Sequence, residues 1–267
     1  MDNPSLKQIA YQASRSWYDV AVVQYSPGAS MPAHAHGFAS MGVVLAGSLI
    51  EDVGATRVEA RAGSMVLKPA GTLHANRFGA TGARLLAVTL DHSHDIVTNW
   101  KFDHWCWKRA LDPYRDALRV VGALVSEAHS RTPMVDDVGD ILTDLIASLT
   151  EPRRLSPGNR KGRWLKDVVS ALDESGEHRP RVAELARLAN VHPVYLARAF
   201  RGAYGVSIAN YRRRQRVLAA LPSITESQST LSRVAATHGF ADHAHLTREC
   251  TDLVGAPPSR IRRLALE

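Results

Sequence analysis

The chain has few cysteines and no long apolar run. Its 267 residues include two cysteines, Cys106 and Cys250, in segments that we expect to fold separately. A structural disulfide is therefore not expected, and reduced thiols fit the chain better. No apolar stretch approaches the ~18 residues that a membrane-spanning helix needs. The first residues also lack the basic and then apolar pattern of a signal peptide. These absences predict a cytoplasmic protein with no membrane partner.

Positive charge is in excess only in the C-terminal part of the chain. Residues 161–267 hold 17 Lys and Arg against 10 Asp and Glu, whereas residues 1–160 hold 16 of each. The basic part has no long apolar helical face with Trp or Phe, which disfavours a membrane surface as its partner. Phosphate attraction supplies most of the affinity for DNA that does not depend on sequence. The charge distribution therefore indicates double-stranded DNA as a partner.

The same part carries one helical pattern twice. Four positions recur at a shift of 50 residues: Phe200 and Cys250, Gly205 and Gly255, Ser207 and Pro257, Arg212 and Arg262. Each copy predicts a short helix, a tight turn and a second helix, which is the arrangement of a helix-turn-helix. The second helix of such a unit enters the major groove, so its outward residues are the candidate DNA contacts. They are Val194, Ala197, Arg198 and Arg201 in the first copy, and His243, Ala244, Thr247 and Arg248 in the second.

This repeat resembles the AraC-type transcription regulators over residues 163–265. The residues that carry the resemblance include Leu185-Ala186, Leu196, Phe200, Gly205, Arg216, Ala235, Gly239-Phe240, Asp242, Arg248, Pro257-Pro258 and Arg262. Leu246 and Cys250 depart from it, because the family usually has aromatic residues there. Six further arginines are expected to contact phosphates or to pack the ends of the module: Arg212, Arg213, Arg214, Arg260, Arg262 and Arg263.

Residues 19–90 read as short strands separated by Gly and Pro turns. We expect strands over 19–26, 41–51, 56–60, 64–68, 73–78 and 84–90, which is typical of a small antiparallel barrel or jelly roll. Two segments resemble the halves of a cupin motif: Gly28-x5-His34-x-His36 and Gly63-x5-Pro69-x-Gly71-x2-His74. Three imidazoles brought together would suit a divalent metal such as Zn, Fe, Ni or Mn. The glutamate of the cupin motif is missing, since Ser40 and Met41 stand there. A metal, an organic effector and a relic without a ligand all remain open for His34, His36 and His74.

The predicted fold class is α+β, with an N-terminal cupin-like β-barrel and a C-terminal all-α double helix-turn-helix domain. We expect a sensor barrel over 1–110, a helical pair over 111–150, a polar linker over 151–162 and a DNA-binding domain over 163–267. The helical pair either forms a dimer interface or packs on the barrel. A long helix is expected over 207–221, ending at Pro222. Trp105 and Trp107 are interpreted as packing residues, and His92 and His94 as parts of a solvated turn.

The predicted function is sequence-specific transcription regulation that responds to a ligand in the barrel. We expect no catalytic residues and no cofactor beyond a divalent metal. The expected partners are double-stranded DNA, a small-molecule or metal effector and a second copy of the chain, with RNA polymerase as a candidate. Two alternatives remain. The first is a metal-dependent cupin enzyme with a DNA-binding tail. The second is a constitutive DNA-architectural protein, which would bind DNA with little specificity, whereas a regulator should prefer its site by at least ~10³.

Overall fold

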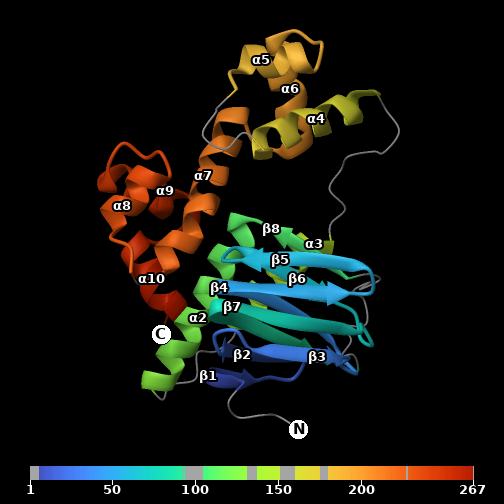
Figure 1. The fold of residues 1–267 in the computed structure, drawn as a ribbon, viewed down its shortest axis with the longest axis vertical. Coiled ribbons are helices and arrows are strands. Elements are labelled where there is room, and N and C mark those ends of the chain that lie inside the picture. Colours follow the sequence, from blue (N-terminus) through green and yellow to red (C-terminus); the bar gives the residue numbers. More distant parts are fainter. Residues whose placement is uncertain are drawn as a thin grey trace.

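The computed structural model describes residues 6–91, 93, 105–130, 137–150, 160–174, 180–226 and 228–266. Its N-terminal part is one curved antiparallel sheet of eight strands, called the β-domain below (Figure 1). The strands are β1 (Lys7–Ser14), β2 (Tyr18–Tyr25), β3 (Ser30–His34), β4 (Ala39–Val53), β5 (Thr56–Arg61), β6 (Ser64–Lys68), β7 (His74–Leu90) and β8 (Cys106–Arg109). Their order is β1-β2-β7-β4-β6-β8, with β3 also paired to β7 and β5 to β4.

The strand prediction was wrong at one break and missed three strands. The segments expected over 73–78 and 84–90 are the two ends of the single strand β7. Gly82 of β7 has a φ of +77°, and a Cβ on Gly47 of β4 would lie 2.2 Å from the Gly82 carbonyl oxygen. Two glycines thus let the long strands cross closely at a bend, where the sequence suggested a turn. The strands β1, β3 and β8 were not expected.

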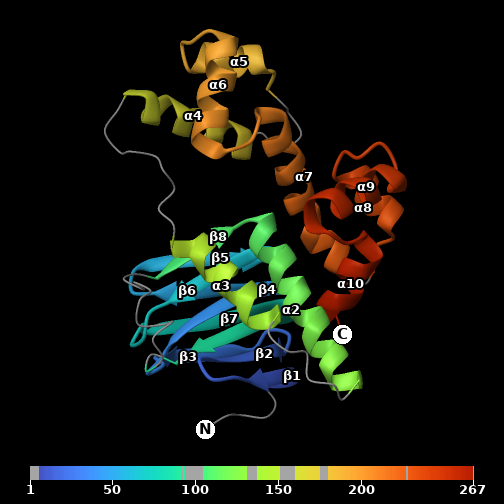
Figure 2. The same ribbon diagram turned by 180° about the vertical axis from the view of Figure 1, so that it is seen from behind.

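Two helices cover one face of the sheet (Figure 2). They are α2 (Leu111–Ser130) and α3 (Asp137–Thr150). The apolar stripe of α2, including Leu118, Val121 and Leu124, is buried in one cluster with sheet residues such as Leu86. The Tyr114 hydroxyl donates a hydrogen bond of 2.9 Å to the Leu45 carbonyl. The stripe is therefore covered within one chain, and this packing removes the reason for expecting a dimer interface there.

The C-terminal part contains seven helices within the described residues. They are α4 (Arg160–Glu174), α5 (Val182–Leu188), α6 (Pro193–Tyr204), α7 (Ile208–Thr225), α8 (Leu231–Thr237), α9 (His243–Val254) and α10 (Pro258–Leu266). The first helix begins at Arg160, inside the segment expected to be linker; residues 151–159 lie outside the described part. None of the helices in that part is both long and apolar enough to cross a membrane.

Helix α7 continues through Pro222 to Thr225, so the expected helix end at Pro222 was wrong. Proline has no amide hydrogen, and the Leu218 carbonyl therefore lacks its usual partner one turn later. The Arg109 guanidinium of β8 donates to that carbonyl over 2.7 Å. A break in the helix hydrogen bonding is thus satisfied from the β-domain.

The two helical units differ in what they pack against. Helices α4, α5 and α6 and the start of α7 enclose a separate core that includes Leu172, Leu196 and Phe200. The rest of α7 and helices α8 to α10 share one core with the β-domain and α2. Figures 1 and 2 show the first unit standing clear of the sheet, whereas α10 lies beside α2. A Cβ on Gly63, just before β6, would come within 2.7 Å of Leu218, which shows how closely α7 approaches.

Candidate DNA-reading surface and histidine cluster

Helix α6 presents the expected residues on one exposed face. His192 caps its start by accepting a hydrogen bond of 3.3 Å from the Val194 amide, and Gly205 ends it with a φ of +72°. Leu196 and Phe200 point into the core. The opposite side of the helix carries the four expected contacts, all exposed: Val194, Ala197, Arg198 and Arg201.

Helix α9 repeats this construction 50 residues later. The Asp242 carboxylate caps its start by accepting from the His245 amide over 2.6 Å, and Gly255 ends it with a φ of +79°. Leu246 and Cys250, the two departures from the family pattern, are both fully buried. His243, Ala244 and Arg248 are exposed and Thr247 is half-buried. Both second helices therefore offer the outward residues that the sequence indicated.

Several of the other arginines hold the helices together. Arg213 of α7 bonds Glu249 over 2.9 Å and Asp252 over 2.6 Å, both on α9. Arg262 donates to the carbonyls of Ile224 and Ser229. Arg212 donates to the Pro180 carbonyl, and Arg214 pairs with Asp112 of α2. Of the two roles expected for these four arginines, the structure shows the packing one.

Three histidines meet inside the β-domain. His34 ends β3, His36 follows it, and His74 begins β7 as the register partner of His34. Each offers a ring nitrogen, and these nitrogens lie within 4.8 Å of one another. The described group contains no carboxylate. The three imidazoles predicted to converge thus do so.

Backbone carbonyls fix two of the three rings. The Nδ1 atoms of His34 and His74 lie 2.8 Å and 2.9 Å from the carbonyls of Pro32 and Thr72. A carbonyl only accepts, so each Nδ1 carries a hydrogen, and in the neutral imidazole the free lone pair is then on Nε2. The His34 Nε2 is buried without a hydrogen-bond partner. This is the tautomer and orientation that a metal-binding imidazole needs.

The surroundings of His36 and His74 disfavour the charged form of both side chains. Burial, followed by the nearby Lys68 charge, lowers the pKa of His74 to about 4. Burial also lowers the pKa of His36, with smaller effects from His34 and Lys68. A neutral imidazole is the form that binds a metal ion. The lowered pKa values of His36 and His74 therefore favour the form of these two side chains that binds a metal.

A buried carboxylate beside the cluster was missed by the sequence reading. Glu51 of β4 is fully buried and bonds Lys68 over 2.7 Å and Asn76 over 3.1 Å. The indole nitrogens of Trp105 and Trp107 donate to its other oxygen over 2.8 Å and 2.7 Å. The interpretation of both tryptophans as packing residues was therefore incomplete. The available signal was a glutamate within an apolar strand.

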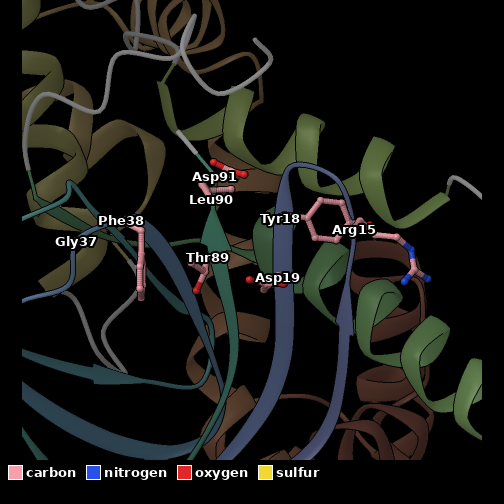
Figure 3. Close-up of a pocket in the computed structure, with 8 residues that line it drawn as sticks. All are labelled: Arg15, Tyr18, Asp19, Gly37, Phe38, Thr89, Leu90 and Asp91. Carbon is pink, nitrogen blue, oxygen red and sulfur yellow. The ribbon is translucent and has the colours of Figure 1, made fainter. Parts of the chain in front are cut away.

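A cavity of about 370 Å³ lies beside Phe38, which precedes β4 (Figure 3). Its wall comprises Arg15, Tyr18, Asp19, Gly37, Phe38, Thr89, Leu90 and Asp91. The Phe38 ring stacks on His36 at 5.1 Å between ring centres. His92 and His94, expected in a solvated turn, lie outside the described residues.

Comparisons with known proteins find a family match for the C-terminal helices and another for the β-domain. A helix-turn-helix domain family matches residues 185–264, and a cupin domain family matches residues 21–89. The chain is an AraC-type helix-turn-helix protein with a cupin domain. This AraC-type protein is 23% identical to the HTH-type transcriptional activator RhaR of Salmonella schwarzengrund (strain CVM19633) over 166 residues. That match spans 61% of the chain and 59% of the relative's length.

Two solved structures resemble this AraC-type protein at low sequence identity. ToxT from Vibrio cholerae is 10% identical with a TM-score of 0.37, over 94% of this chain and all of that one. A cupin superfamily protein from Desulfitobacterium hafniense DCB-2 is 14% identical with a TM-score of 0.30, over 34% of this chain and 82% of that one.

Proposed function

We propose that the chain is a sequence-specific DNA-binding transcription regulator. The observation that carries this proposal is the pair of exposed helix faces, built alike and related by a shift of 50 residues. Arg198 and Arg248 occupy equivalent positions on the two faces. Arginine pairs with two acceptor atoms of guanine in the major groove. Two such helices entering the groove about one helical turn, or ~34 Å, apart would read two segments of one site.

Substitution of either arginine tests this proposal. We expect Arg198→Ala or Arg248→Ala to weaken binding to a DNA site selected from a random pool by ~1–3 kcal/mol, with far less effect on random DNA. Arg119→Ala is the matched control, because this exposed arginine lies on α2. Equal losses on selected and random DNA would show that the two arginines contact only phosphates. A chain that selects no sequence would favour the architectural alternative.

We further propose that His34, His36 and His74 hold a divalent metal through which the β-domain senses its effector. The fixed tautomers, the lowered pKa values and the unpartnered His34 Nε2 fit a metal. A metal held by three imidazoles keeps open positions for oxygen atoms of a small molecule. Because Glu51 is committed to four partners, it is not offered as a base. This arrangement supports binding rather than turnover, so we propose that the protein is not an enzyme.

Metal content measured after dialysis against Zn, Mn, Fe or Ni tests the site. We expect about one metal ion per chain for one of these metals, and a loss of it in His34→Ala and His74→Ala. His243→Ala is the control, since His243 is exposed on α9. If the wild type retains no metal, or if both variants retain it, the cluster is not a metal site.

Contacts between the β-domain and α7 support a response to ligand. Strand β6 has Lys68 of the buried polar cluster at its end and Gly63, which touches Leu218, just before its start. Its partner β8 carries Trp107 and then Arg109, which bonds the Leu218 carbonyl. A ligand changes DNA affinity only by favouring one of two arrangements of the protein. We propose that the β6–β8 pair carries this preference to α7.

Arg109→Met tests the coupling. We expect the variant to bind metal and DNA separately, but to lose the difference in DNA affinity between metal-free and metal-loaded protein. Arg77→Met, on the exposed side of β7, is the control. A coupling that persists unchanged in Arg109→Met would show that another contact carries it.

A further inference from the structure

The two reading helices are built alike but expose different side chains. The shift of 50 residues places Ala244 opposite Val194, Thr247 opposite Ala197, Arg248 opposite Arg198 and Thr251 opposite Arg201. These positions cover about two turns of one side of each helix and face away from the buried Leu196 and Leu246. Both faces therefore have an arginine at the position of Arg198. One turn earlier, the first face has Val194 and the second has Ala244.

Helices α5 and α6 of the first unit expose large apolar side chains at positions where the second unit has smaller or polar residues. Val194 is 53% exposed, and Leu188 and Tyr195 are 57% and 41% exposed. The shift of 50 residues puts His238, Ala244 and His245 at the equivalent positions. Tyr195 lies toward Trp164 of α4, with 6.1 Å between ring centres. Val194 is thus the large apolar side chain that lies within the reading face itself.

The Val194 side chain has no hydrogen-bonding group, so it cannot pair with a base edge or a phosphate. Arg198 lies one turn further along the same face and Arg201 two turns along. In the major groove, the C5 methyl group of thymine is the apolar feature that distinguishes base pairs. A branched apolar side chain beside two arginines therefore fits a thymine next to the base that Arg198 reads.

We propose that Val194 reads a thymine methyl group in the segment contacted by α6, an inference that rests on the proposed function. The first segment of the DNA site then combines a thymine with a neighbouring guanine. In the second segment, Arg248 reads a guanine, but Ala244 reaches less far and buries less of any methyl group. The two segments of the site are consequently not repeats of one sequence.

Replacing thymine by uracil in the selected DNA site tests this inference, because uracil pairs identically and lacks only the methyl group. The segment read by α6 is the one whose base preference is lost in Arg198→Ala. We expect one thymine in it whose replacement weakens binding about fourfold, which corresponds to ~0.8 kcal/mol for one buried methyl group. In Val194→Ala the same replacement should change binding less than about twofold, because alanine buries less of the thymine methyl group than valine does.

Leu188→Ala is the matched control, since Leu188 is as exposed as Val194 but lies on α5, and it should keep the full uracil effect. A site that is selected and depends on Arg198, yet contains no uracil-sensitive thymine in that segment, would overturn the inference and leave the proposed function intact. A uracil effect that is undiminished in Val194→Ala would also overturn it. Failure to select any sequence would refute the proposed function itself.

Discussion

Gly63→Ala measures how firmly α7 is docked on the β-domain. Gly63 has a φ of +87°, a left-handed conformation that costs a residue with a Cβ about 1–2 kcal/mol. A Cβ there would also lie 2.7 Å from Leu218 Cδ1 and 3.1 Å from Leu221 Cδ1. Both leucines are buried, so they have little room to move away, and overpacking of this kind costs about 1–3 kcal/mol. The two effects together predict a loss of about 2–5 kcal/mol in the free energy of unfolding.

Gly54→Ala separates the backbone strain from the contact. Gly54 has a φ of +56°, in the turn between β4 and β5, and nothing lies within 4 Å of a Cβ built on it. It should therefore lose only the strain of about 1–2 kcal/mol. Urea unfolding of both variants, followed by circular dichroism, measures the difference. An equal loss in Gly54→Ala and Gly63→Ala would refute the reasoning, because it would mean that α7 does not press on Gly63.

Glu51→Gln should destabilise the β-domain by about 3 kcal/mol, the lower end for a broken buried ion pair, because the Lys68 side chain keeps 16% exposure. Burial raises the pKa of Glu51, but the Lys68 charge and hydrogen bonds outweigh it and hold the pKa below its ordinary value. Its stabilising effect is therefore complete above about pH 4.5 and is lost as the pH falls further. Urea unfolding at a series of pH values should show the free energy of unfolding of the wild type falling below that pH, without the same fall in the variant. Burial raises the pKa of the Cys250 thiol to about 12. Iodoacetamide at about pH 8 should accordingly modify half-buried Cys106 and spare Cys250 until the protein is unfolded, as mass spectrometry would show; similar labelling of both would mean that the core around α9 opens readily.

The helical repeat could be predicted from the sequence because its signals are local. Ser207 and Asp242 are residue types that favour helix starts, and both accept hydrogen bonds from amides in the first turns of α7 and α9. The converging histidines were predictable for a similar reason, since the residue types and their spacing are visible in the chain.

Features that depend on distant partners could not be predicted. The four-residue strand β8 is too short to show a pattern, and the role of Trp107 depends on Glu51, 56 residues earlier. The passage of α7 through Pro222 depends on Arg109, which satisfies the Leu218 carbonyl from another domain. In each case a tertiary contact overrides the local preference.

The helix-turn-helix match spans two different hydrophobic cores. Residues 185–264 include Leu196, in the core of the first unit, and Ile261, in the core shared with the β-domain. Part of the matched segment therefore shares its hydrophobic core with the β-domain. If such a segment were recombined in evolution with a different sensor, the new sensor would have to offer an apolar surface where Gly63 now receives Leu218 and Leu221. Exchange of the sensor would thus be constrained by the surface under the second unit, whereas the separate core of the first unit carries no such constraint.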